Sequence, residues 1–347
     1  MAVSPVEVVR RTPEHDDEIF RLYGEVFGER RTADSRARWR WQYLDNPAGD
    51  GAPEIWVARD GRAILGQYAS MPVRLWWGGR EVRSSWGMDV FLREQARGRG
   101  VGAQLFTAWS DHVEVALGLG LTESSYGLFK KLRFRDVGPV PFYWRWLDPK
   151  AVARRRLGRV LGTAAGAVLE AAASADPPAD PAITVSTIDG FDDRYDALWE
   201  RARGTYRMCV RRDAGYLDWK YVRCPHRRYD LREAVRGGAL AGFAVSRHEE
   251  DRGLVRGWIV DLFAAADDHA ARGALLGATL GSFRQAGVGR VQAFAMSRAV
   301  GEDLRRFGFR RGRSPMQFCV RARADEGRAL EHPEDWHVVF GDSDMDR

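Results

Sequence analysis

Cysteine is scarce in this chain of 347 residues, which contains three. Cys209, Cys224 and Cys319 lie far apart and form no C-x-x-C pair, so the sequence predicts neither a structural zinc site nor a disulfide framework. Long apolar runs are also missing, because the longest, residues 160–173, is rich in alanine and glycine and contains Glu170. We therefore expect no membrane span. Since the N-terminal residues lack the apolar segment of a secretion signal, we expect a cytoplasmic protein. Because the cysteines are not paired, we also expect it to hold no metal.

The excess of charge of one sign is small. The chain has 54 Lys and Arg residues against 48 Asp and Glu residues, which gives a net charge of +6. The acidic residues are spread among the basic ones, so the sequence has no basic stripe of the kind that binds nucleic acid. Hydrophobic residues make up 45% of the chain, which is enough for the cores of two domains.

One proline-rich segment, residues 175–181, divides the chain. It follows a run of arginines and alanines that favours a helix, and proline ends such a run. We therefore expect one globular piece over residues 1–149, a helical linker between the two pieces over 150–182, and a second piece over 183–324. The charged tail, residues 325–347, is expected to fray.

The two pieces are similar to each other in sequence. Three segments recur in the same order, between 172 and 178 residues apart, and this regular spacing predicts a tandem duplication. The matching pairs are Trp41–Pro47 with Trp219–Pro225, Asp89–Phe91 with Asp261–Phe263, and Phe129–Phe134 with Leu304–Phe309.

The order of the expected elements indicates the fold class. Several antiparallel strands are expected within residues 54–92, after a helix over 16–27, and one β-α-β unit follows them. This order predicts an α/β fold of the α+β type in each copy, with a mixed, mostly antiparallel sheet flanked by helices and not a doubly wound sheet. The later elements of the first copy are expected at Gly102–Leu117 (helix), Leu119–Glu123 (strand), Tyr126–Leu132 (helix) and Phe142–Leu147 (last strand).

A glycine-rich loop between an expected strand and an expected helix carries the clearest chemical signal. Its residues are Arg97, Gly98, Arg99, Gly100, Val101, Gly102 and Ala103. Glycines allow the backbone N–H groups to turn inward, the helix N-terminus adds partial positive charge, and the two arginines add full charges. The loop therefore predicts a binding site for a pyrophosphate.

Two other interpretations of this loop are possible. Gly98, Gly100 and Ala103 also satisfy the dinucleotide pattern G-x-G-x-x-A, and Glu123 follows about twenty residues later, where a ribose-binding acid belongs. That pattern requires an apolar strand leading into the first glycine, whereas residues 93–97 are polar. The loop could also be a glycine-rich start of a helix that binds no ligand.

The loop, as Arg97-x-x-Gly100-x-Gly102, resembles the acyl-CoA loop R/Q-x-x-G-x-G/A of the GCN5-related N-acetyltransferase (GNAT) superfamily. Residues 129–134 resemble the family's Y-x-x-x-G-F element, and residues 41–47 resemble a W-[KR]-Y-x-x-x-P element of one branch. The resemblance implies two tandem GNAT folds and acetyl-CoA, or another acyl-CoA, as co-substrate. It implies transfer of the acyl group to an amine of a small-molecule acceptor. The backbone of Val90, Phe91 and Leu92 would pair with the pantetheine.

The sequence departs from the family in two places. The second copy has Asp267 and Asp268 where its loop should be, so the resemblance implies one acyl-CoA site, in the first copy. Phe129 and Leu304 stand where many members have a tyrosine that protonates the leaving thiolate. A non-catalytic acyl-CoA-binding or scaffold protein of the same fold is the alternative function.

Three residues are candidates for proton transfer. Asp89 opens the strand before the loop, Glu123 ends the next expected strand, and Tyr126 lies one turn before Phe129. Either carboxylate could accept a proton from the amine, and Tyr126 could replace the missing tyrosine. Each also has a structural interpretation, as a backbone cap or as an acid at a helix N-terminus. Because the first copy has no cysteine, we expect direct attack of the amine without an acyl-enzyme.

Overall fold

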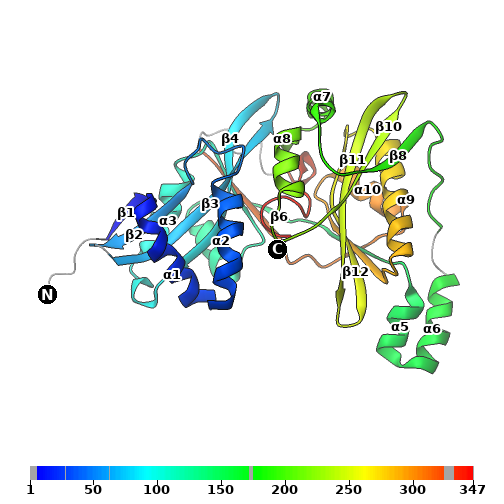
Figure 1. Ribbon diagram of the computed structural model, residues 1–347, viewed down its shortest axis with the longest axis horizontal. Coiled ribbons are helices and arrows are strands. Elements are labelled where there is room, and N and C mark those ends of the chain that lie inside the picture. Colours follow the sequence, from blue (N-terminus) through cyan, green and yellow to red (C-terminus); the bar gives the residue numbers. More distant parts are fainter. Residues whose placement is uncertain (1–5, 28, 62, 172–174, 324–331, 347) are drawn as a thin grey trace.

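Two mixed sheets, each flanked by helices, lie side by side in the computed structural model (Figure 1). The structure describes residues 6–27, 29–61, 63–171, 175–323 and 332–346. The expected fold class, a mixed and mostly antiparallel sheet flanked by helices in each half, is confirmed. The sheets mark a first domain and a second domain.

In the first domain, α1 and α2 cover one face of the sheet and α3 and α4 cover the other. Its central strand order is β1-β2-β3-β4-β5-β15-β6. The elements are β1 (Glu7–Arg10), α1 (Asp16–Phe27), α2 (Glu29–Tyr43), β2 (Ile55–Asp60), β3 (Ala63–Trp77), β4 (Arg80–Leu92), α3 (Val101–Ser110), β5 (Val115–Leu119), α4 (Glu123–Lys131), β6 (Arg135–Pro139) and β15 (Gln317–Ala322).

The second domain repeats this arrangement, with α9 and α10 on one face of its sheet and α7 and α8 on the other. The strand order is β14-β7-β13-β12-β11-β10-β8. The elements are β7 (Phe142–Trp146), β8 (Ile183–Ile188), α7 (Asp193–Ala202), α8 (Ala214–Leu217), β10 (Asp230–Arg236), β11 (Ala239–Asp251), β12 (Leu254–Ala264), α9 (His269–Gln285), β13 (Arg290–Phe294), α10 (Arg298–Arg306) and β14 (Arg310–Gly312).

The two domains exchange strands, which corrects the expected boundaries. We expected the strand near Phe142 to close the first copy, but β7 pairs with β13 and β14 in the second sheet. In return, β15 pairs with β5 and β6 inside the first sheet. A third link is β9 (Met208–Val210), which pairs with β3. Neither sheet is therefore made from one continuous piece of chain.

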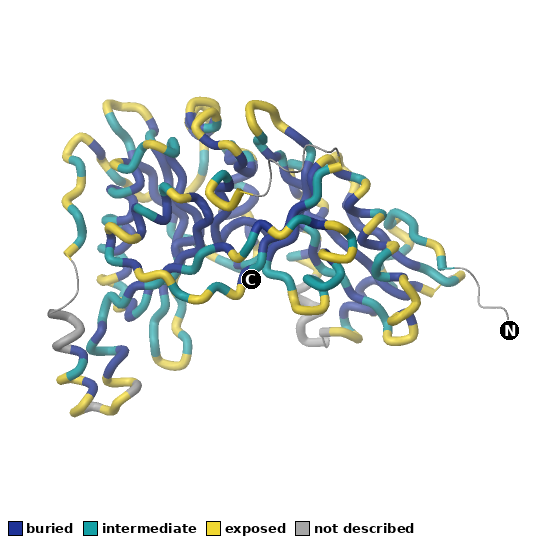
Figure 2. Tube along the Cα trace, turned by 180° about the vertical axis from the view of Figure 1, so that it is seen from behind, coloured by how far each residue is buried: buried dark blue, intermediate teal, exposed yellow. Residues whose placement is uncertain are grey.

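The duplicated tryptophans form the centre of the contact between the domains. Trp41 donates its Nε1–H to the carbonyl oxygen of Trp219 at 2.7 Å, and Trp219 donates to that of Trp41 at 2.8 Å. Their rings stack with centroids 5.0 Å apart. This reciprocal contact is what a twofold relation between two copies produces. Buried residues of both domains, which Figure 2 shows in dark blue, belong to one core cluster that includes the two tryptophans.

Two expected elements of the first copy were misplaced. The helix expected to reach Leu117 ends at Ser110. The strand expected over Leu119–Glu123 instead spans Val115–Leu119, as β5. Every residue of β5 is buried, so this apolar run lies in the middle of a sheet. A short, fully apolar run has no helical or strand periodicity that would have separated the two elements.

The arginine- and alanine-rich segment is helical, as expected, but it does not lie between the two sheets. It forms two helices, α5 (Pro149–Leu157) and α6 (Arg159–Ala171), which pack against each other and project from the second domain (Figure 1). Glycines allow this close contact, because a Cβ on Gly162 would come within 2.3 Å of the Arg154 backbone. Within the described ranges, no helix is both long and apolar enough to cross a membrane.

We predict that residues 1–149 do not form a stable domain by themselves. This fragment lacks β15, so the edges of β5 and β6 would be left unpaired in the middle of the sheet. Expressed alone, it should be insoluble or should unfold without a cooperative transition in urea, whereas coexpression with residues 150–347 should recover folded protein. A soluble fragment that unfolds cooperatively would contradict the prediction.

Candidate active site

A cleft of about 960 Å³ opens where β4 and β5 separate. The two strands pair in parallel only from Ser84 to Trp86 on β4, and beyond that point they diverge. The walls come from β4, from the ends of α3 and β5, from α4, and from the C-terminal segment near Asp344. This places the expected loop, the strand Val90–Leu92 and Asp89 around one cavity.

The loop of residues 97–103 forms one end of the cleft, where Arg97 and Gly102 line it. Gly98 and Gly100 have φ angles of 74° and 78°, which are left-handed conformations that glycine adopts without strain. Gly100 is the N-cap of α3, and no side chain caps the helix. The first N–H groups of α3 are therefore left for a ligand, as a phosphate-binding helix start requires.

The corresponding place in the second domain is closed by its own side chains. Asp268 caps α9 by accepting a hydrogen bond from the N–H of Ala271, and it pairs with Arg236 at 2.8 Å. The space between β12 and β13 is also occupied, because Gly341 donates its N–H to Val260 and Met296 donates to Val338. The second domain therefore offers neither an open helix start nor an open separation of strands.

Asp89 lies on a bulge of β4 and lines the cleft. The pairing register shifts between Gln67 and Ala69, so that Tyr68 lies opposite two residues, Asp89 and Val90. Asp89 has a φ of 45°, which is unusual for a residue other than glycine. Its carboxylate accepts hydrogen bonds from Tyr43 at 2.7 Å and from Tyr23 at 3.1 Å.

Both tyrosines bind Asp89 as neutral hydrogen-bond donors. Burial, reinforced by the negative charge of Asp89, raises the pKa of both Tyr23 and Tyr43 well above the ordinary value. Both hydroxyls therefore keep their protons and donate. The second copy repeats the contact between Tyr221 and Asp261 at 2.9 Å, but there Arg212 also pairs with the carboxylate, which is 1% exposed. Asp261 is thus structural, whereas Asp89 faces a cavity.

Glu123 and Tyr126 lie outside the cleft lining. Glu123 is exposed in the first turn of α4, so it is an acid at a helix N-terminus, which was the structural alternative to a catalytic role. Tyr126 donates its hydroxyl to Asp136, and this hydrogen bond raises the pKa of Tyr126 to about 12. Phe129, where the sequence resemblance led us to expect a tyrosine, does line the cleft and packs against Gly118.

Several residues of the cleft were missed by sequence reasoning, and three of them matter most here. Tyr68 reaches it from β3, and Asp344 and Met345 reach it from the C-terminal end of the chain. Met345 packs so closely on Gly120 that a Cβ there would lie 2.3 Å from its sulfur. No motif marks Tyr68. The alternating aspartates of residues 342–346 were visible in the sequence, but they were interpreted as a frayed tail.

The expectation of a frayed tail is wrong for residues 332–346. β16 (Trp336–His337) pairs with β9, and three aspartates that follow it are each paired with an arginine. Asp342 binds Arg212 at 3.0 Å, Asp344 binds Arg38 at 3.3 Å, and Asp346 binds Arg247 at 2.6 Å. Because a charge is buried only with a partner, these pairs fix the path of the segment between the domains.

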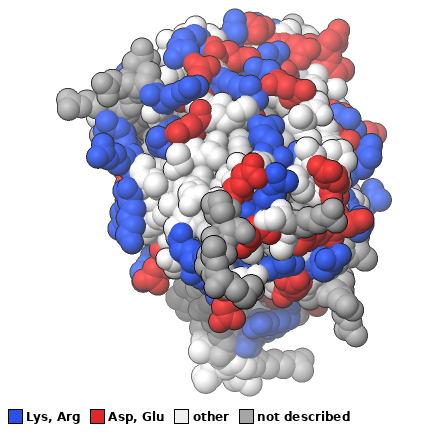
Figure 3. Space-filling model, turned by 90° about the vertical axis from the view of Figure 1, so that its left-hand side faces the viewer, with Lys and Arg blue, Asp and Glu red and all other residues white. Residues whose placement is uncertain are grey.

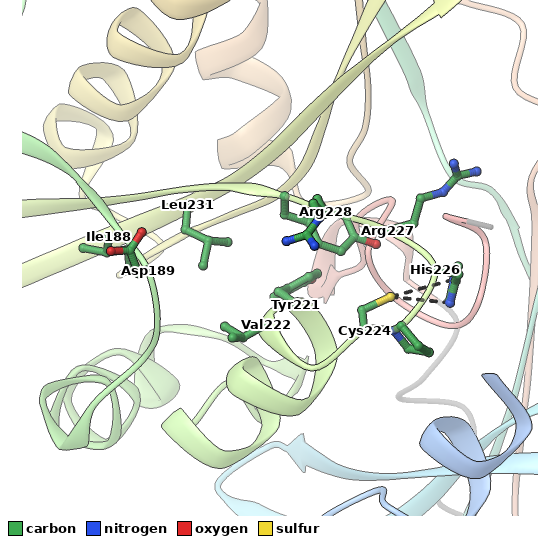
Figure 4. A pocket seen from close by; sticks show the side chains of 11 residues that line it. Ile188, Asp189, Tyr221, Val222, Cys224, His226, Arg227, Arg228 and Leu231 are labelled. Carbon is green, nitrogen blue, oxygen red and sulfur yellow. Dashed lines mark hydrogen bonds between the residues drawn. The ribbon is translucent and has the colours of Figure 1, made fainter. Parts of the chain in front are cut away.

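A second pocket, of about 590 Å³, lies in the second domain and contains a cysteine and a histidine side by side (Figure 4). Cys224 and His226 are within hydrogen-bonding distance at 3.6 Å. Burial raises the pKa of the Cys224 thiol and lowers that of His226 to about 4, so both are neutral at pH 7. The pair therefore lacks the thiolate that nucleophilic catalysis requires.

The surface of the first domain carries charges of both signs. Figure 3 shows basic and acidic side chains interspersed on this face.

The two remaining cysteines are also unreactive, because burial raises the pKa of Cys209 and of Cys319 to about 12. Like Cys224, neither lines the cleft. The lining of the cleft, as far as the structure describes it, therefore contains no cysteine.

Comparison with known proteins agrees with this geometry. Residues 7–117 match the family model described as an acetyltransferase (GNAT) domain. A probable N-acyltransferase from Enterococcus faecalis has a similar structure, with a TM-score of 0.64 and 13% identity over 92% of this chain and 73% of that one. N-myristoyltransferase of Saccharomyces cerevisiae with bound myristoyl-CoA is also similar in structure, with a TM-score of 0.55 and 13% identity over 92% of this chain and 83% of that one. Eis1 of Mycobacterium abscessus has a TM-score of 0.54 and 15% identity over 94% of this chain and 76% of that one. No curated protein matches in sequence.

We predict that Arg212→Ala destabilises the protein by about 3–5 kcal/mol at pH 7.5, because it leaves two buried carboxylates without a cation. Burial disfavours the charge of Asp261, but the charge of Arg212 and the hydrogen bond from Tyr221 outweigh it and lower the pKa. The wild type therefore loses this stabilisation as the pH falls through the lowered pKa. In the variant, burial outweighs the remaining hydrogen bond from Tyr221 and raises the pKa, so the deficit should shrink between pH 7.5 and pH 5.

Urea unfolding at the two pH values measures this difference. Arg298→Ala is the control, because its pair with Glu302 lies on the surface and its loss should not move the midpoint. A deficit that stays constant with pH would contradict the explanation.

Proposed function

We propose that this chain, a member of the GNAT superfamily with two tandem GNAT-like domains, transfers an acyl group from acyl-CoA to an amine of a small-molecule acceptor. Direct attack of the amine in a ternary complex is the mechanism that we infer. The acyl donor would be acetyl-CoA or a longer acyl-CoA.

The observation that carries the proposal is the contrast between the two helix starts. The N-terminus of α3 has no side-chain cap and adjoins a cleft that Arg97 lines, whereas Asp268 caps α9 and Arg236 neutralises it. A pyrophosphate fits the first arrangement, since the N–H groups, the helix dipole and Arg97 all favour an anion. It does not fit the second, where a carboxylate already holds that position. One acyl-CoA per chain follows.

The residues around the cleft have distinct tasks in this reaction. The strand Val90–Leu92 offers backbone groups to the pantetheine arm, as the family resemblance implies. An amine arrives protonated at neutral pH, so a base must first remove a proton. We assign this task to Asp89, which lies in the cleft and is oriented by Tyr23 and Tyr43. Asp344, on the wall formed by the C-terminal segment, is the second carboxylate among the described lining residues.

The alternative is a protein that binds acyl-CoA without reacting. Release of free CoA that depends on an added amine separates the two functions, because a binding protein would release none. Mass-spectrometric screening of an amine library with acetyl-CoA and longer acyl-CoAs would identify both the acceptor and the acyl length.

We predict that isothermal titration calorimetry gives one acetyl-CoA per chain and that Gly102→Glu weakens binding by about a hundredfold or more, because the new carboxylate enters the phosphate site. The protein itself leaves room for the change, since a Cβ on Gly102 comes no closer than 3.4 Å to another atom. Ala270→Glu is the matched control, because Ala270 is the second residue of α9 as Gly102 is of α3. Two bound molecules per chain, or equal effects of both variants, would contradict the prediction.

We predict that Asp89→Asn lowers the rate constant at saturating acetyl-CoA by about a hundredfold, as loss of a positioned base does. Glu123→Gln should stay within about threefold of the wild type, because Glu123 lies outside the cleft. Single-turnover rates with an acceptor from the screen measure both variants, and calorimetry checks that acetyl-CoA still binds. If Asp89→Asn keeps its rate while Asp344→Asn loses it, the assignment of the base to Asp89 is wrong.

A further inference from the structure

Tyr68 lies in the cleft with a hydroxyl that has no hydrogen-bond partner among the described residues. The residue is 1% exposed, so its ring is buried while its polar atom is left without a bond. The hydroxyl is not among the fully enclosed polar atoms of the described residues, so it opens into the cleft, where a bound group can accept its hydrogen bond.

The ring of Tyr68 cannot easily turn away. It stacks on Trp109 with centroids 4.8 Å apart and meets the edge of Phe106 at 4.4 Å. Its oxygen lies over Gly87, where an added Cβ would come within 2.0 Å of it. Gly87 is the first residue of β4 beyond the pairing with β5, so the hydroxyl is held at the point where the cleft begins.

Tyr68 also belongs to the same aromatic cluster as Phe129. Phe106 contacts both rings, with centroids 4.4 Å from Tyr68 and 5.1 Å from Phe129. Burial raises the pKa of Tyr68 well above the ordinary value, so the hydroxyl carries its proton at neutral pH. A proton donor therefore exists beside the place where Phe129 removes the hydroxyl found in many related enzymes.

We propose that Tyr68 is the catalytic acid of the reaction and that its hydroxyl protonates the departing sulfur of CoA. This inference rests on the proposed function. As the amine nitrogen bonds to the thioester carbon, the C–S bond breaks and its electron pair stays on sulfur. Asp89 first passes the extra proton of the ammonium group to solvent. When the N–C bond forms, Asp89 accepts the second N–H proton while sulfur takes the proton of Tyr68, and water then carries the proton from Asp89 back to the tyrosinate.

The first test needs no acceptor. The dissociation constants of CoA and of desulfo-CoA, which has no thiol, are measured at pH 7 and pH 9.5 for the wild type and for Tyr68→Phe. A hydroxyl that donates to the thiolate should make wild-type binding of CoA stronger at pH 9.5 relative to desulfo-CoA, and Tyr68→Phe should lose this gain. Equal pH dependence in both proteins would overturn the role of Tyr68.

The second test is the rate. Tyr68→Phe should lower the single-turnover rate by about a hundredfold while the dissociation constant of acetyl-CoA changes by less than about threefold. Tyr195→Phe is the control, because it removes a buried hydroxyl bonded to Glu233 in the second domain. A rate for Tyr68→Phe within about threefold of the wild type would overturn the proposal.

A third variant keeps the test valid if Tyr68→Phe folds poorly. Replacing Tyr68 with 3-fluorotyrosine preserves the ring and makes the phenol more acidic, so the loss of rate at high pH should begin at a lower pH. An unchanged pH profile would overturn the proposal. A wild type that binds neither CoA nor desulfo-CoA would instead overturn the proposed function, and the role of Tyr68 with it.

Discussion

The pairing of three C-terminal aspartates with three arginines is the constraint on which the asymmetry of this molecule depends. Asp342, Asp344 and Asp346 alternate along the chain, and each is held by an arginine from a different segment. Because buried carboxylates are stable only with such partners, the segment has one path between the domains. Along that path it fills the separation of strands in the second sheet, and it forms a wall of the open cleft in the first.

A duplicated chain thus uses the same elements for two purposes. The tryptophans Trp41 and Trp219 bond to each other reciprocally, and each copy keeps a tyrosine that bonds an aspartate on its fourth sheet strand. In the first copy this aspartate faces a cavity. In the second, Arg212 neutralises it and the helix start beside it is capped. The two copies therefore differ at these positions through a few partners and not through a different fold.

Much of this could be predicted from the sequence. The glycines at 98 and 100 have positive φ angles and leave the start of α3 uncapped, as the loop pattern indicated. The three recurring segments identified the duplication, and the order of antiparallel strands before one β-α-β unit identified the fold class. These features depend on neighbouring residues or on repetition, both of which a single sequence displays.

The rest was decided by tertiary structure. The exchange of β7 and β15 between the sheets could not be predicted, because each strand satisfies its local pattern in either sheet and only the packing of the whole chain selects one. The aspartates of the tail are paired with arginines up to 306 residues away in the sequence. Without knowledge of these partners, the charges of the tail predicted a solvent-exposed segment. Glu123 and Asp89 were both candidates, as carboxylates beside the loop. The structure distinguishes them, because Asp89 lines the cleft whereas Glu123 is exposed in the first turn of α4. Tyr68 was one aromatic residue of a β-strand until the bulge and Gly87 placed its hydroxyl in the cleft. Sequence determines which groups are available, and long-range packing determines which of them meet.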